Sequence, residues 1–186
     1  HVSAWLLRGM AHMTMVQETG LMIAGGAETT RTVIAHGIRV LADHPDQWEY
    51  LAADPARVAT AVEELIRWVT PLNNMFRIAA TDAEVAGTAI AAGDRIALVY
   101  PAANRDETVF DDPYRFDVTR DPNPHLSFGH GTHFCLGANL ARREITVMFR
   151  ELFKRLPDIH TVGEPDYLNS NFVNGIKHLR AEFTPG

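Results

Sequence analysis

A stretch rich in apolar residues and free of proline runs from about residue 13 to residue 44. Its content of Met, Leu, Ile, Val, Ala and Thr predicts a single long helix. Gly20, Gly25 and Gly26 interrupt this stretch, and each glycine weakens a helix interior by ~1 kcal/mol relative to alanine. We therefore expect these glycines to serve packing or the close approach of a ligand.

Proline residues punctuate the rest of the helical pattern. Pro45 ends the long helix, and the pair Asp54-Pro55 repeats this stop-and-start signal. Pro157 closes a later stretch whose apolar residues are spaced as on an amphipathic helix. The helices predicted after the long one span residues 46–51, 56–69 and 138–156.

Short apolar segments separated by turn residues follow the third predicted helix. They lie at residues 77–80, 84–85 and 96–100, are punctuated by Gly87 and Gly93, and predict a small sheet. The whole pattern therefore predicts a mainly α fold with small β-sheets, in the α+β class.

Residues 101–134 carry four prolines together with many Asp, Asn and Gly residues. A segment this long with little regular structure in a compact domain is usually functional. It leads directly to the single cysteine, Cys135. Near the end of the chain, Asn174-Gly175 lies between apolar flanks and predicts a terminal hairpin.

The length of 186 residues suits one domain with a substantial core. Residues 1–12 show no clear periodicity, so we expect there an irregular segment, or one foreign to the domain, and a single domain over residues 13–186. Lys and Arg total 17 against 23 Asp and Glu, a net charge of −6 that argues against nucleic acid as a partner. No apolar run approaches the ~20 residues of a membrane helix, so we expect no membrane anchor and a cytoplasmic protein.

A glycine-rich loop places the lone cysteine directly before the last predicted helix, in the sequence F-G-H-G-T-H-F-C-L-G over residues 128–137. Backbone N–H groups at a helix N-terminus carry partial positive charge and hydrogen-bond a thiolate, which suits Cys135 as a metal ligand. Gly131 and Gly137 carry no side chain where a flat cofactor would approach the backbone.

Two other interpretations of this loop stay open. Cys135 could be an inert buried thiol, which is the usual state of a single cysteine. Zinc held by His130, His133 and Cys135 is the second, although the spacing H-x2-H-x-C matches no familiar zinc pattern.

The loop closely resembles the haem-binding signature of the cytochrome P-450 family, in which the cysteine is the axial thiolate of the haem iron. Two further motifs agree in the right order. Gly25-Gly26-Ala27-Glu28-Thr29-Thr30 resembles the oxygen-binding stretch of the family's long central helix, and Glu64-Leu65-Ile66-Arg67 resembles its E-x-x-R motif. The resemblance runs from about Leu21 to the end, so we expect this chain to hold the C-terminal, haem-binding part of a single P-450-type domain, without the N-terminal part.

The resemblance implies haem b (iron protoporphyrin IX) as the cofactor, with Cys135 as the iron ligand. Glu28 and Thr29 would deliver protons to dioxygen. The alternative for such a pair is a solvated acid and a hydroxyl bonded to its own helix backbone.

A structural triad is also implied, formed by Glu64, Arg67 and Arg115, the last from the segment P-Y-R-F-D. A buried carboxylate needs such partners, and the triad would pin the cysteine loop against its helix.

Further contacts to the haem follow from the same resemblance. Arg77 and His133 would bind the propionates, with His125 as a weaker candidate. Phe128 would pack beside the thiolate and restrict water. The glycines expected to line the cofactor are Gly25, Gly26, Gly129, Gly131 and Gly137. The residues expected in an apolar substrate pocket are Met22, Ala24, Leu72, Met75, Phe172 and Val173.

The implied function is a monooxygenase that inserts one atom of dioxygen into a C–H bond of an apolar small molecule, with sterols and other lipids as candidate substrates. Its electrons would come from a ferredoxin and a ferredoxin reductase. Arg142, Arg143 and Arg150 could form a basic docking patch for them or be merely solvated. Two alternatives are a truncated, noncatalytic haem-binding fragment and a haem-thiolate peroxygenase or isomerase, which needs no proton relay.

Overall fold

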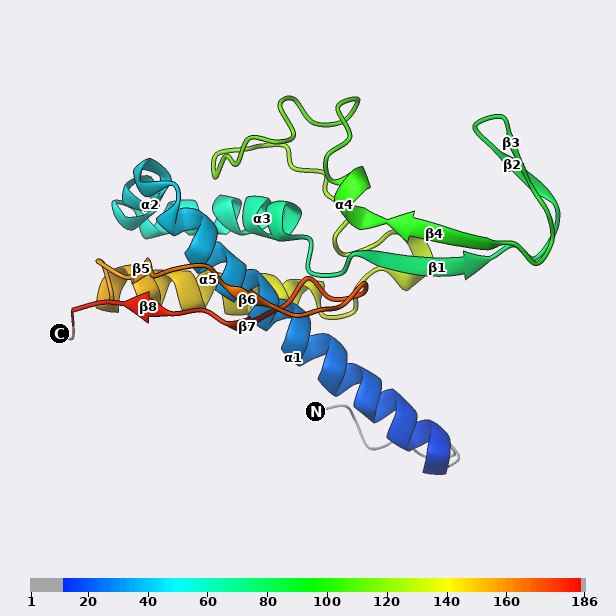
Figure 1. Ribbon diagram of the computed structural model, residues 1–186, viewed down its shortest axis with the longest axis horizontal. Helices are drawn as coiled ribbons and strands as arrows, with labels where there is room; N and C mark the ends of the chain where they lie inside the picture. The colour runs from blue at the N-terminus through cyan, green and yellow to red at the C-terminus, as the bar shows by residue number, and fades with distance from the viewer. Residues whose placement is uncertain (1–11, 185–186) are drawn as a thin grey trace.

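The computed structural model describes residues 12–184, and the long apolar stretch forms one helix in it, α1 (His12–Ala42) (Figure 1). This agrees with the predicted helix, which is followed by Pro45. The expectation for residues 1–12 lies outside the described residues except at His12, where α1 begins.

The glycines predicted to weaken this helix lie within its unbroken length. A Cβ atom added to any of them would meet no atom within 4 Å; they are Gly20, Gly25 and Gly26. Among the described residues, these glycines therefore relieve no packing clash, which leaves the close approach of a ligand as their expected use.

Helices α2 (Pro45–Ala52) and α5 (Ala138–Arg155) agree with the proline signals. The remaining predicted helix begins as a single 3-10 turn, η1 (Pro55–Arg57), and continues as α3 (Val58–Val69). Asp54 caps this start, because its side chain accepts a 2.9 Å hydrogen bond from the backbone N–H of Ala56.

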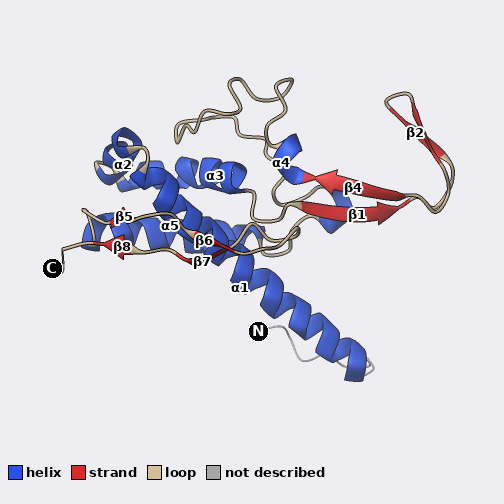
Figure 2. Cartoon of the chain, viewed as in Figure 1, coloured by secondary structure: helices blue, strands red, loops and turns tan. Residues whose placement is uncertain are grey.

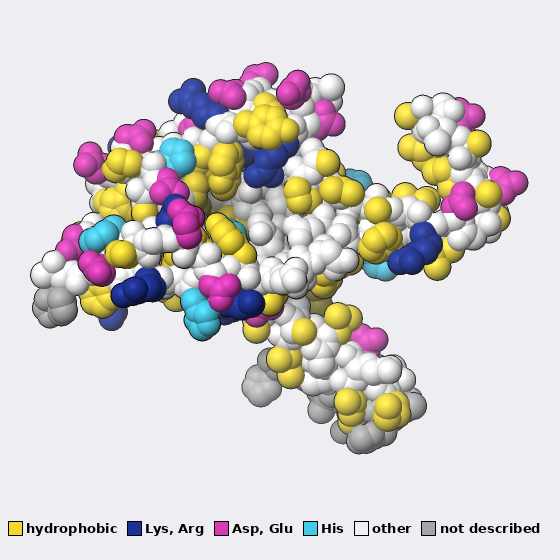
Figure 3. Space-filling model, viewed as in Figure 1, with side chains coloured by type: hydrophobic (Ala, Val, Ile, Leu, Met, Phe, Trp, Pro, Cys, Tyr) yellow, Lys and Arg dark blue, Asp and Glu magenta, His cyan; other side chains and the backbone are white. Residues whose placement is uncertain are grey.

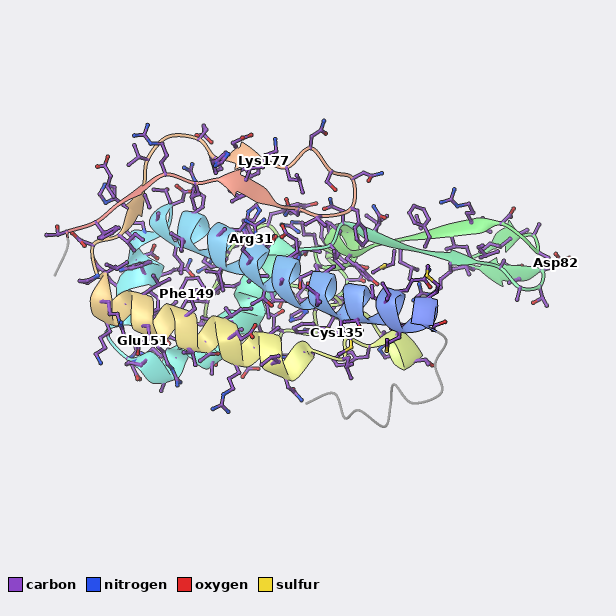
Figure 4. The ribbon with its side chains drawn as sticks, turned by 90° about the horizontal axis from the view of Figure 1, so that it is seen from below. Arg31, Asp82, Cys135, Phe149, Glu151 and Lys177 are labelled. Atoms are coloured by element: carbon purple, nitrogen blue, oxygen red, sulfur yellow. The ribbon has the colours of Figure 1, made fainter. Side chains whose placement is uncertain are left out.

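The hydrophobic core lies where these four helices meet. Helices α1 and α5 pack tightly at Gly37, where an added Cβ would lie 2.6 Å from Cζ of Phe149. Phe149 lies on α5 in Figure 4 and has 1% of its surface exposed. Leu41, Leu51 and Leu65 fill the same core from α1, α2 and α3. This packing fixes the orientation of α5 and with it the loop that precedes it.

Four strands extend away from the helices (Figure 2). β1 (Asn74–Ile78) pairs antiparallel with β4 (Arg95–Val99), and β2 (Ala83–Val85) pairs with β3 (Thr88–Ile90). The small sheet that the sequence predicts is therefore two separate two-stranded sheets. The strand at β3 was not predicted, since three residues between turn glycines give no recognisable alternation.

Two short strand pairs follow α5. β5 (His160–Thr161) pairs with β8 (Ala181–Glu182), and β6 (Asp166–Tyr167) pairs with β7 (Ile176–His178). The predicted terminal hairpin exists as β6–β7. The prediction that its two strands meet in a tight turn at Asn174-Gly175 was wrong, because residues 168–175 form the connection.

Tertiary hydrogen bonds explain this longer connection. The backbone N–H of Asn174 donates to the Pro71 carbonyl at 3.0 Å, and its side chain donates to the Val69 carbonyl at 2.8 Å. Asn174 therefore joins the end of the chain to the end of α3 instead of forming a two-residue turn.

The proline-rich segment has little regular structure, as predicted. It begins with one turn of helix, α4 (Tyr100–Ala103), and the only other regular element before Cys135 within it is the 3-10 turn η2 (Gly131–His133). Between residues 12 and 184, no helix combines the length and apolar character that crossing a bilayer requires.

Candidate functional site

The loop that carries Cys135 is folded back on itself immediately before α5. Gly129 (φ +72°) and Gly131 (φ +70°) adopt left-handed backbone conformations that side chains disfavour, which accounts for glycine at both positions. The Cys135 backbone N–H donates to the Phe128 carbonyl at 2.9 Å. This bond joins the two ends of the loop, and it fixes the cysteine beside the N-terminus of α5 (Figure 4).

The surface around the thiol suits a flat, largely apolar cofactor such as the haem that the resemblance implies. Cys135 is exposed, and so are its large apolar neighbours: Phe134 is 52% and Leu136 90% exposed. Gly131 and Gly137 leave open space, since a Cβ added to either would meet no atom within 4 Å. The interpretation of Cys135 as an inert buried thiol is therefore wrong. The donor chemistry of a lone accessible sulfur on an apolar surface fits a haem-thiolate site.

Zinc fits less well. Among residues 12–184, no group of three or more His, Cys, Asp or Glu side chains is arranged to hold a metal ion. His130, His133 and Cys135 are thus close in sequence without forming a ligand cluster.

The E-x-x-R pair is completely buried on α3. Arg67 donates two 2.7 Å hydrogen bonds to the Glu64 carboxylate, and neither side chain has exposed surface. Arg67 also donates to the backbone carbonyls of Asn104 and Pro113, each at 2.9 Å. This pair therefore ties α3 to the long loop that leads to the cysteine.

The assignment of Arg115 as the third member of the triad was wrong. Arg115 is exposed, and only its backbone carbonyl reaches the pair, as an acceptor for Arg67 at 3.3 Å. The arginine beside the carboxylate is Arg120, whose Nε lies 3.3 Å from Oε2 of Glu64. Asn123 and the backbone N–H of Asp117 also donate to this carboxylate, each at 3.0 Å.

Asn104, which sequence reasoning missed, connects the same helix to the cysteine loop. It is fully buried, and its amide donates to the hydroxyls of Thr70 and Ser127, each at 2.8 Å. Its Oδ1 accepts from the Leu126 backbone N–H at 2.7 Å, and Ser127 Oγ donates to the Ile66 carbonyl at 2.9 Å. A single asparagine in a loop gives no sequence signal for such a role.

A second carboxylate on α3 serves the other side of the loop. Glu63 accepts hydrogen bonds from Arg142 at 2.7 and 2.9 Å and lies 3.2 Å from Nε2 of His125. Burial raises the pKa of Glu63, but hydrogen bonds from His125 and Arg142 and their charges outweigh it and bring the pKa to about 2. His125, the weaker candidate for binding a propionate, instead faces Glu63, and its side chain is 2% exposed.

The guanidinium of Arg142 also lies over the ring of Phe128, 4.5 Å from its centroid. Arg142 is therefore paired with other side chains of the protein, and Arg150 donates to the Pro55 carbonyl at 3.0 Å. Two of the three arginines considered for a basic docking patch, Arg142 and Arg150, are thus hydrogen-bonded to other groups of the protein.

The acid–threonine pair lies on α1, and both side chains bond within the helix. Thr29 Oγ1 donates to the Gly25 carbonyl at 2.8 Å, and the Glu28 carboxylate pairs with Arg31, whose Nε lies 3.3 Å from it. Arg31 in turn donates to the Ile176 carbonyl at 3.2 Å. The structure thus has the back-bonded arrangement of Thr29, while Glu28 is ion-paired rather than merely solvated.

Two of the three segments predicted to line the substrate pocket lie side by side. Leu72 and Val173 form an antiparallel bridge, and the Asn73 N–H donates to the Phe172 carbonyl at 2.8 Å. His36 of α1 lies 2.8 Å from the Asn174 carbonyl, which adds the central helix to the same region. Met22 and Ala24 lie farther toward the N-terminus of α1 and are exposed.

Arg77, predicted to bind a propionate, lies on β1 two residues from Met75, so both occupy the same face of the strand. Its guanidinium donates to the Phe76 carbonyl at 2.9 Å. His133 ends η2 and is exposed on the cysteine loop. Both positions offer cationic or N–H donors next to apolar surface, as bound carboxylates require.

An apolar groove of about 820 Å³ runs between α1 and α5, on residues that include Ile34, Val147 and Met148. None of the predicted pocket residues lines it. Figure 3 shows further exposed apolar side chains along the N-terminal half of α1 and on the strands.

Comparison with known proteins gives consistent results. The steroid C26-monooxygenase of Mycobacterium tuberculosis is 44% identical over 174 residues, covering 92% of this chain and 44% of that protein. The methyl-branched lipid omega-hydroxylase of the same organism is 50% identical over 161 residues, covering 86% of this chain and 38% of that protein. The chain therefore spans less than half the length of these curated relatives.

Solved structures agree with this result. A cytochrome P450 of Mycobacterium marinum in complex with pseudoionone is 45% identical, with a TM-score of 0.85 over 88% of this chain and 40% of that one. One from Bacillus megaterium in complex with corticosterone is 33% identical, with a TM-score of 0.88 over 94% of this chain and 48% of that one. The family model described as Cytochrome P450 matches residues 7–180. The chain belongs to the cytochrome P450 family, with the fold of part of that family's domain.

Proposed function

We propose that the protein is a haem-thiolate monooxygenase with Cys135 as the axial ligand of haem b. The observation that carries this proposal is the accessible Cys135 sulfur on an apolar loop that hydrogen bonds hold in place. Membership of the family implies the haem. A haem bound through a thiolate supplies dioxygen activation, because electron donation from the sulfur favours O–O cleavage.

The overall reaction inserts one oxygen atom into a C–H bond and releases the other as water, which consumes two electrons and two protons. Thr29 and Glu28 are the groups that would move these protons. Rotation of the Thr29 side chain frees its hydroxyl from the Gly25 carbonyl, and separation from Arg31 frees the Glu28 carboxylate. Both changes involve side chains only, so the backbone of α1 need not move.

Arg77 and His133 would hold the carboxylates at the cofactor edge. Phe128 would shield the sulfur from water on the side where it packs against Phe134, at a ring-centroid distance of 6.2 Å. Restricting water beside the ligand would tune the reduction potential of the site.

The substrate would be an apolar small molecule, and a sterol or another lipid is the class we favour. Leu72, Met75, Phe172 and Val173 supply apolar surface on two hydrogen-bonded segments. The relatives named for steroid and methyl-branched lipid oxidation support the same class. We further propose a ferredoxin and its reductase as the electron donors, and the cytoplasm as the compartment.

Isotope labelling tests this function. Haem-loaded protein is supplied with a ferredoxin, its reductase and NADH, a sterol or a methyl-branched lipid, and ¹⁸O₂. We expect a hydroxylated product that carries one ¹⁸O atom. A product formed only from added hydrogen peroxide, or an isomerised product without label, would overturn the monooxygenase in favour of a peroxygenase or isomerase. Haem binding without any product would indicate a noncatalytic fragment.

A further inference from the structure

We propose that Arg142, clamped by Glu63, is a positioning residue that holds Phe128 and, through it, the backbone of Cys135. Its effect on a bound haem rests on the proposed function, whereas its effect on the loop does not.

The first step of the argument is the rigidity of Arg142. Its Nε and Nη2 donate to the two carboxylate oxygens of Glu63 at 2.7 and 2.9 Å, a two-point contact that fixes the plane of the guanidinium. Arg142 is about one-third and Glu63 about one-quarter exposed, so water screens this pair less than it screens a surface pair. The carboxylate is fixed in turn, because it lies 3.2 Å from Nε2 of His125, a side chain with 2% exposure.

The second step is the contact between Arg142 and Phe128. The centre of the guanidinium lies 4.5 Å from the ring centroid, within the range of a cation–π interaction. The His125 ring packs on the same phenylalanine at a centroid distance of 5.6 Å. Both groups that bind Glu63 therefore also contact the Phe128 ring, Arg142 from α5 and His125 from the loop before the cysteine.

The third step is the connection to the cysteine. The Phe128 carbonyl accepts the hydrogen bond from the Cys135 N–H at 2.9 Å, so displacement of Phe128 moves the acceptor of that bond. The pKa of the Arg142 guanidinium is raised mainly by hydrogen bonding to Glu63, against an opposing effect of burial, with a smaller contribution from attraction to Cys135.

The chain offers a matched control on the same helix. Arg143 carries the same charge one residue later, but it is exposed and lines the groove between α1 and α5. Its removal deletes a charge from α5 without touching Glu63 or Phe128.

Hydrogen exchange of the Cys135 amide in the complete chain tests the positioning role without any haem. We expect exchange about tenfold faster in Arg142→Gln and in Glu63→Gln, with the double variant no faster than either single one. Arg143→Gln should leave the rate unchanged. The Leu65 amide, inside α3, reports whether the core stays folded.

Unchanged Cys135 exchange in Arg142→Gln would overturn the proposal, and so would equal acceleration in Arg143→Gln. If hydrogen exchange of the Leu65 amide is also faster in Arg142→Gln, Arg142→Lys is compared with the native chain instead. This variant keeps the charge and loses the two-point contact. Selective acceleration at Cys135 in that variant supports the proposal, and its absence contradicts it.

The midpoint reduction potential of the haem-loaded protein separates the charge from the contact. Reduction adds negative charge at the metal, so loss of a nearby cation should lower the potential in Arg142→Gln, while Arg142→Lys and Arg143→Gln stay close to the original value. An unchanged potential in Arg142→Gln would contradict an action of its charge on the site. Failure of the native chain to bind haem would count against the proposed function, and the exchange result would still decide the positioning role.

Discussion

The Nε atom of Arg120 lies 3.3 Å from Oε2 of Glu64, a carboxylate with no exposed surface. Arg120 also donates to the backbone carbonyls of Asp111 and Asp112, at 2.8 and 3.2 Å. One side chain therefore joins the buried carboxylate of α3 to the turn that precedes the cysteine loop. Because Arg67 approaches the same carboxylate from within α3, two cations share one anion in the interior.

Replacing Arg120 should therefore destabilise the fold more than replacing Arg115. We expect Arg120→Ala to lower the free energy of unfolding by about 1.5–3 kcal/mol, the usual effect of losing hydrogen bonds to a charged group. Arg115→Ala should change it by less than about 0.5 kcal/mol, because that side chain is exposed. Urea unfolding of the two variants measures the difference. Equal losses would contradict the assignment of Arg120.

Removing the carboxylate itself should have a larger effect. Glu64→Gln leaves Arg67 buried without its counter-charge, for which we expect a loss of about 3–5 kcal/mol. The same urea titration measures it. A loss below that of Arg120→Ala would show that the carboxylate does not organise this network.

The contact between α1 and α5 predicts opposite effects for two glycines of one helix. Gly37→Ala would place a Cβ 2.6 Å from Phe149 Cζ, so we expect a net destabilisation of about 1–2 kcal/mol after the gain in helix propensity. Gly20→Ala meets no atom within 4 Å and should be neutral or stabilising by up to about 1 kcal/mol. Thermal unfolding compares them, and a stabilised Gly37→Ala would contradict the close approach of these helices.

The Glu63 carboxylate gives the stability a defined pH dependence. Its pKa in the folded protein is about 2, below the ordinary 4.5, so its contribution is complete above about pH 4.5 and is lost as the pH falls toward 2. The stability difference between the native chain and Glu63→Gln should shrink over the same window. Urea unfolding at a series of pH values measures that difference, and a constant value down to pH 2 would contradict the pairing with Arg142 and His125.

Thr29→Ala in the haem-loaded enzyme should uncouple electron use from product formation. The alanine has no hydroxyl to leave the Gly25 carbonyl and pass on a proton, so reducing equivalents should appear as hydrogen peroxide. The yield of product per NADH measures the coupling, with Thr29→Ser as the control that keeps the hydroxyl. Full coupling in the alanine variant would remove Thr29 from the proton path.

Local signals in the sequence predicted the helices and the turn before Cys135 well, since prolines end helices and glycines permit left-handed turns wherever they occur. The contacts that depend on tertiary packing were not predictable in this way. Arg115 and Arg120 are equally plausible partners for a distant carboxylate until the path of the loop is known. Gly37 gives no sign of its role, because the ring that requires its small size lies on α5. The partners of Asn104 and Glu63 could not be predicted from the sequence for the same reason.

The central claim is that Cys135 is the axial ligand of a haem, and its most direct test is the absorption spectrum of the dithionite-reduced protein with haemin and carbon monoxide. Since Cys135 is the only cysteine, Cys135→Ala removes every thiol from the chain. We expect the long-wavelength Soret band of thiolate ligation in the native protein and its loss in the variant. A native protein that binds no haem, or one whose Soret band is the same with and without Cys135, would contradict the account.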